Sequence, residues 1–159
     1  MSTSYPTFPI PNPGDDPAAW KKREALQNLM TRLVDAREGL DAMLKRAEPE
    51  IEHILKKIRE EHHEAIERVS AIMVSEGAEP DGGGSAMSTV NKAVATTRAL
   101  FDDLDTDVLK QVADGEQNVL DAFSGAIEEH DDGRTREELV EMRQTLEGLV
   151  SEARQMARS

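Results

Sequence analysis

The fold is decided by PEIEHILKKIREEHHEAIERVSAIMVSEG, residues Pro49–Gly77. Apolar residues recur in this stretch every three or four positions, the spacing that places side chains on one face of an α-helix. Proline suits the first turn of a helix, and glycine commonly follows the last turn. The stretch therefore predicts one amphipathic helix. The residues of its apolar stripe are Ile51, Ile54, Leu55, Ile58, Ala65, Val69, Ile72 and Met73.

Three further stretches show the same periodicity. One runs from about Asp16 to Ala47 and opens with an Asp-Pro pair that suits a helix N-terminus. The other two follow residues 103–106 and the turn His130–Thr135. Between the second and third long helices lies GAEPDGGGS, Gly77–Ser85, the strongest helix breaker in the chain, and a shorter helix follows it.

These elements predict an all-α protein, an antiparallel four-helix bundle. Short links near Glu48 and Asp132 make two helical hairpins. The long middle link, with its short extra helix, joins the hairpins as in ferritin-like bundles that have one crossover. We expect a single domain over residues 18–159 with an aliphatic, methionine-filled core, because only 3% of the residues are aromatic.

The N-terminal residues 1–17 form a Pro-rich segment ahead of this domain, with five of the seven prolines. Their composition predicts an extended tail. Two of the five aromatic residues, Tyr5 and Phe8, lie in it beside Ile10. Large apolar side chains are costly to leave in water. We therefore expect a partner-binding tail that docks on its own bundle or on a neighbouring subunit.

The charge is strongly negative, with a net value of −13. Residues 101–133 contain 11 acidic residues and one basic residue, whereas residues 18–47 contain seven basic and four acidic residues. The acidic third long helix is therefore expected to lie near the basic first helix. This charge disfavours nucleic acid and anionic membranes as partners. The chain has no cysteine, no apolar run long enough to span a bilayer and no secretory signal, so we expect a cytoplasmic protein.

Four polar residues fall on or near the predicted apolar stripes, at similar heights in the bundle: Arg37, His62, Glu116 and Arg143. They predict one polar layer halfway along the bundle. In one interpretation, Glu116 pairs with Arg37 or Arg143, His62 completes the hydrogen bonds, and the layer fixes the register of the helices. In the other, the layer binds a ligand or a metal.

Metal-binding bundles of the ferritin type use Glu-x-x-His on two helices. Only Glu60 and His63 have this spacing here, and both are predicted to face water because they lie far from the apolar stripe. The last helix has no histidine. We therefore expect no cofactor, and the remaining candidates for an iron or manganese site are His62, Glu116 and Glu38. The chain also lacks a phosphate-binding glycine loop and an activated nucleophile, so no catalytic residues are predicted.

Two stretches resemble a bacterial ferritin-like four-helix-bundle family of unknown function (domain of unknown function 2383). They are GAEPDGGGSAMSTVNKA, Gly77–Ala93, and VADGEQNVLDAFSGAI, Val112–Ile127, with a looser match at Leu33–Leu44. The resemblance spans about residues 25–157 and implies the bundle fold. It implies no established activity, and Glu152 stands where a last-helix histidine is expected.

Three functional hypotheses follow. The first is a non-enzymatic interaction or stress-related protein that forms a homo-oligomer and binds a protein partner. The second is a divergent ferritin-like metal-binding protein or oxidase. The third is a carrier of a small apolar ligand, in which methionines would line the pocket. Those methionines are Met30, Met43, Met73 and Met142.

Overall fold

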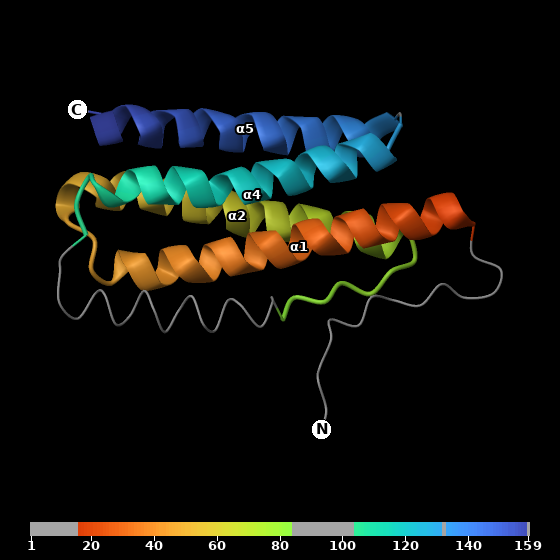
Figure 1. Cartoon of the computed structure of the whole chain (residues 1–159). Helices are drawn as coiled ribbons and strands as arrows, with labels where there is room; N and C mark the ends of the chain where they lie inside the picture. The colour runs from red at the N-terminus through yellow and green to blue at the C-terminus, as the bar shows by residue number, and fades with distance from the viewer. Residues whose placement is uncertain (1–15, 84–103, 132, 159) are drawn as a thin grey trace, which may run out of the picture.

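The computed structural model describes residues 16–83, 104–131 and 133–158, and these form an all-α, antiparallel four-helix bundle (Figure 1). The fold class predicted from the apolar periodicity is therefore confirmed. The tail up to residue 15, with Tyr5, Phe8 and Ile10, and the short crossover helix expected after residue 85 lie outside the described residues. The helices are α1 (Pro17–Leu44), α2 (Pro49–Ser75), α4 (Val108–Glu129) and α5 (Gly133–Arg158).

The ends of α1 and α2 follow local chemistry. The side chain of Asp16 accepts a hydrogen bond from the backbone N–H of Ala18, as an N-cap does, and Pro17 occupies the first helical position. Gly77 follows α2 with a φ of 80°, a left-handed conformation that glycine adopts without strain. These boundaries agree with the sequence signals.

Two boundaries differ from the sequence prediction. Helix α1 ends at Leu44, three residues before the predicted end at Ala47. The link after it makes backbone hydrogen bonds with Leu104 instead, from Leu104 to the Arg46 carbonyl and from Glu48 to the Leu104 carbonyl. A long-range backbone pairing therefore replaces the last helical turn. Helix α5 begins at Gly133, inside the predicted turn.

The packing of the helices follows from the long crossover. Helix α1 packs against α2 and α4, and α5 packs against α4 and α2, so α2 and α4 lie diagonally across the bundle. Leu104, just before α4, pairs with Arg46 and Glu48 in the link between α1 and α2. Helix α4 therefore begins at the end of the bundle where α2 begins, and the two helices are parallel. The first residues of the crossover are held against α1, because the Gln27 side-chain amide both donates to the Asp81 carbonyl and accepts from the Asp81 N–H.

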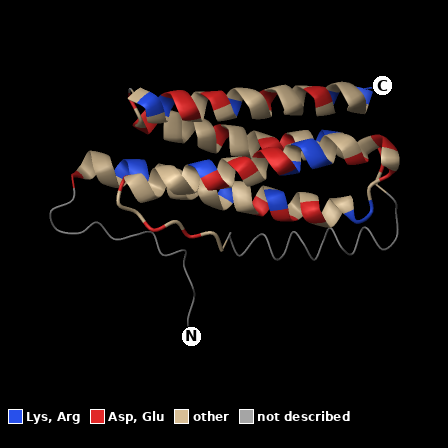
Figure 2. Cartoon of the chain, turned by 180° about the vertical axis from the view of Figure 1, so that it is seen from behind, with Lys and Arg blue, Asp and Glu red and all other residues tan. Residues whose placement is uncertain are grey.

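The core lies between the four stripes and is mostly aliphatic. Phe123 is its only described aromatic member, and Met30, Met73 and Met142 are fully buried within it, while Met43 packs partly buried at its edge. Acidic and basic residues are distributed along all four helices (Figure 2). Among the described helices, none has the length and apolarity needed to cross a membrane.

Candidate functional site

The centre of the bundle contains a buried pair of ionisable side chains, His62 on α2 and Glu116 on α4. Both lie on the apolar faces of their helices, and they are 0% and 3% exposed. The His62 Nε2 atom lies 2.7 Å from a carboxylate oxygen of Glu116, which is a strong hydrogen bond. Each group therefore supplies the partner that the other needs in an apolar interior.

The second ring nitrogen of His62 is buried without a partner. Among the described residues, no hydrogen-bonding group reaches His62 Nδ1. The tautomer that places the proton on Nε2 lets the ring donate to Glu116 and leaves only an acceptor lone pair unsatisfied at Nδ1. A bare acceptor costs less than a buried N–H without a partner, so this arrangement suits a structural pair.

The other two members of the predicted layer make no hydrogen bond or ion pair with His62 or Glu116 in the part of the chain that the structure describes. Arg37 is half-buried on α1, and the structure gives it no hydrogen bond to His62 or Glu116. Arg143 on α5 donates to the Ser124 hydroxyl and to Glu147. The arginine-to-glutamate pairing considered for this layer is therefore replaced by a direct histidine-to-glutamate contact. The Arg143 side chain is 28% exposed, so its guanidinium group remains near water.

The structure brings together a second pair that sequence analysis missed, Glu76 and His130. His130 is 3% exposed, and the sequence analysis placed it only in a turn. Its Nδ1 lies 2.7 Å from the Ala126 carbonyl, and its Nε2 lies 2.8 Å from Glu76. A carbonyl only accepts, so Nδ1 carries a proton. Its Nε2 then faces the carboxylate of Glu76, so both ring nitrogens have a partner in the interior.

The pairs His62–Glu116 and Glu76–His130 have the same sequence separation and join the same two helices. Each joins residues 54 positions apart, and each bridges α2 or its C-terminal end to α4 or its C-terminal end. The histidine belongs to α2 in one pair and follows α4 in the other. Fourteen residues separate Glu116 from His130, or about 21 Å along the bundle at 1.5 Å per residue. Two polar bridges at this distance define how the diagonal helices are aligned.

The candidate metal ligands do not form a metal centre with these residues. Glu38 is half-buried on α1 and has an interaction of its own, yet it does not reach the unpartnered Nδ1 of His62. Glu60 and His63 are exposed, and His63 pairs with Glu67. Within residues 16–83, 104–131 and 133–158, no three histidine, cysteine, aspartate or glutamate side chains are grouped as a metal ion requires. His62 and Glu116 supply two ligands only.

One carboxyl group beside the central pair has a perturbed acidity. Burial raises the pKa of Glu61 above its usual value, and the neighbouring Glu64 raises it further. His62 and Arg68 act in the opposite direction with a smaller effect. Glu61 is half-buried near the interface of α2 and α5, so its charge is an electrostatic cost to the folded state at neutral pH.

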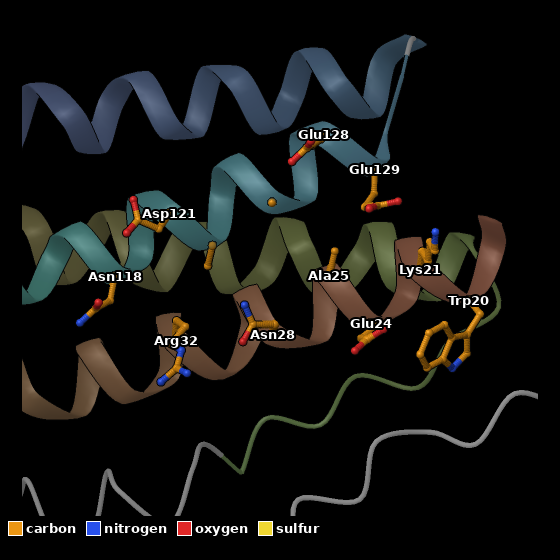
Figure 3. A pocket seen from close by; sticks show the side chains of 12 residues that line it. Trp20, Lys21, Glu24, Ala25, Asn28, Arg32, Asn118, Asp121, Glu128 and Glu129 are labelled. Atoms are coloured by element: carbon orange, nitrogen blue, oxygen red, sulfur yellow. The ribbon is translucent and has the colours of Figure 1, made fainter. Parts of the chain in front are cut away.

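A groove of about 730 Å³ runs along the surface between α1 and α4 (Figure 3). Small residues, Ala25, Ala122 and Gly125, lie along it, and Trp20 lies at its end. A Cβ atom added at Gly125 would meet no other atom within 4 Å, which shows how open this part is. The charged residues that line the groove are Lys21, Glu24 and Arg32 from α1 and Asp121, Glu128 and Glu129 from α4.

The fold and the interior pairs define this chain as a four-helix-bundle protein with polar bridges between diagonal helices. The family described as Domain of unknown function (DUF2383) matches residues 21–129, and the chain belongs to it. The match covers α2 and α4 with the central pair His62 and Glu116, and it ends one residue before His130. No curated protein and no solved structure matches the chain.

Proposed function

We propose that this chain is a non-enzymatic interaction protein that self-associates, with an interaction or stress-related role in the cytoplasm. The observation that carries the proposal is the contrast between the interior and the groove. The buried histidine and glutamate side chains are paired across the bundle, and these pairs join α2 to α4. The groove charges Lys21, Arg32, Glu128 and Glu129 have no hydrogen-bond or ion-pair partner in the described part of the chain.

The N-terminal tail is the second element of this proposal. Tyr5, Phe8 and Ile10 each precede a proline in the sequence, and proline restricts the backbone and so reduces the entropy that is lost when a segment docks. Aromatic and aliphatic side chains presented in this way are typical anchors for a protein surface. We propose that they strengthen contacts with another subunit or with a protein partner.

Analytical ultracentrifugation over a wide concentration range tests this proposal. We expect the mass to rise with concentration for the full chain. Replacing Tyr5, Phe8 and Ile10 together by alanine keeps the prolines and should weaken the association about fivefold or more, because each anchor is worth on the order of 1 kcal/mol. Replacing Ser2, Thr3 and Ser4 by alanine is the matched control. A chain that remains monomeric throughout would contradict the proposal.

A second candidate function, metal binding, is favoured by one observation, the buried and unpartnered Nδ1 of His62 beside the Glu116 carboxylate. Elemental mass spectrometry tests it on protein loaded anaerobically with Fe(II) or Mn(II) and then desalted. Near-stoichiometric metal that is lost in His62→Ala, with helicity retained by circular dichroism, would support a metal site. Equal, negligible metal in both proteins would leave the pair a structural one.

A further inference from the structure

We propose that the groove between α1 and α4 is the surface on which a second copy of this chain docks, about a two-fold axis that runs parallel to the helices. This inference rests on the proposed self-association and names the surface and the residues that provide it.

The two walls carry opposite charge. Helix α1 contributes Lys21 and Arg32, with Glu24 as its one acidic residue, whereas α4 contributes Asp121, Glu128 and Glu129 and no basic residue. Within the described part of the chain these cations make no ion pair with the acids of the facing wall. Asp121 accepts only from Gln117 of its own helix. The groove therefore presents two complementary sets of charges that do not neutralise each other within one molecule.

A two-fold axis along the bundle matches these sets. Helices α1 and α4 are antiparallel. Lys21 and Glu129 lie towards the Trp20 end of the groove, Ala25 lies closest in height to Glu128, and Arg32 lies near the height of Asn118 and Asp121 (Figure 3). Rotation by 180° about such an axis preserves every height and places α1 of the second copy over α4 of the first. Lys21 of each copy then lies near Glu129 of the other, Arg32 lies near Asp121, and every contact occurs twice.

The small residues of the groove allow the second copy to approach. The distance between packed helices depends on the side chains at the contact. Ala25, Ala122 and Gly125 present little volume there, and the space beside Gly125 is open. Val74 on α2 is the only large apolar residue that is well exposed among those the structure describes. The contact is therefore polar, and charge complementarity provides its specificity.

The charges select a second copy over the chain's own tail as the occupant. Residues 1–15 contain one charged side chain, Asp15, which is acidic. The tail therefore cannot neutralise the three carboxylates of α4. A second copy brings its Lys21 and Arg32 to the α4 wall of the first, and the α4 wall of the second copy receives the same two residues from the first.

Charge reversal tests the proposal. Lys21→Glu with Arg32→Glu makes both walls acidic, and Asp121→Lys with Glu128→Lys and Glu129→Lys makes both walls basic. We expect each variant alone to dissociate about tenfold more readily than the wild type, since attraction becomes repulsion at several exposed pairs. An equimolar mixture of the two variants should recover association as a heterodimer, because each acidic wall then faces a basic one.

Two distant sets of substitutions serve as controls for net charge. Lys56→Glu with Lys57→Glu matches the acidic variant, and Glu60→Lys with Glu67→Lys and Glu141→Lys matches the basic one. Sedimentation velocity reports the mass, and circular dichroism reports the fold of each protein.

Recovery of association that is confined to the mixture of groove variants supports the proposal. Self-association that responds equally to both sets would overturn this surface but leave the proposed function standing, and a wild-type monomer would overturn both. If the protein is a monomer and substitutions in the tail change the NMR chemical shifts of backbone amides in the groove, the tail is the occupant instead.

Discussion

At the scale of the residue, the central feature is a carboxylate and an imidazole that satisfy each other inside an apolar core. Glu116 and His62 are each too costly to bury alone. Their 2.7 Å hydrogen bond makes burial tolerable and also excludes alternative alignments of α2 and α4, because any shift along the axis separates the two groups. The pair is better understood as a source of alignment than as a large net source of stability.

Removing one partner therefore has a larger effect than removing both. We expect Glu116→Ala to lower the free energy of unfolding by about 3–5 kcal/mol, because it leaves His62 buried without any partner. His62→Leu combined with Glu116→Leu should remain within about 1 kcal/mol of the wild type or exceed it. Urea unfolding followed by circular dichroism measures both. A single substitution that costs no more than the double one would show that the pair is unimportant.

The ionised side chain of Glu61, unlike that of Glu116, destabilises the folded state. Its folded-state pKa is raised, so the destabilisation is fully present above that pKa and disappears as the pH falls below the value of an unfolded glutamate. Glu61→Gln should therefore stabilise the protein at pH 7, and this gain should vanish at about pH 4. Unfolding curves between these pH values test the sign. Glu64→Gln, at an exposed neighbouring position, is the control and should show a smaller gain.

At the scale of the element, the C-terminal ends of α2 and α4 are joined by side chains. Glu76 caps α2 and contacts His130, whose ring also contacts the Ala126 carbonyl. Arg136 donates to the Ile127 and His130 carbonyls, which would otherwise be unsatisfied at the end of α4. One histidine and one arginine thus hold three helix ends together, namely those of α2, α4 and α5.

A double-mutant cycle on Glu76 and His130 measures this link. We expect Glu76→Ala and His130→Ala to be non-additive by about 0.5–3 kcal/mol, as for residues in direct contact. The exposed pair His63 and Glu67, 3.7 Å apart, is the matched control and should couple by less than about 0.5 kcal/mol. Similar coupling in both cycles would contradict the interpretation that burial makes the first pair specific.

At the scale of the whole molecule, each helix buries its stripe against helices of both hairpins. Helix α1 packs on α4 as well as on α2, and both histidine pairs join one hairpin to the other. The hairpins therefore share one core, and neither can bury its apolar face alone.

A fragment of residues 16–83, which contains only α1 and α2, should therefore lack a stable fold. We expect its far-ultraviolet circular dichroism to show much less helix than its share of the full chain, and its thermal transition to lose cooperativity. Isolated helices without tertiary packing are marginal in water. A fragment that melts cooperatively near the temperature of the full chain would show that the hairpin is an independent unit.

The sequence by itself determined the helices and the faces that they bury, because helical periodicity is local and the stripes of α2, α4 and α5 are regular. It also directed His62 and Glu116 towards the core, since an angle on a helix depends only on spacing. It did not determine which polar group meets which. That contact depends on the relative height of two diagonal helices, which is fixed by the way all four helices pack together.

His130 illustrates the same limit. Its position in the run His130–Thr135 indicated a turn, and no local pattern marked it as buried. Only the tertiary structure brings the end of α2 beside it and supplies Glu76 as a partner. The groove likewise exists only where α1 and α4 meet. Contacts between residues far apart in sequence arise from the way stripes interlock in three dimensions, and helical spacing carries no information about that arrangement.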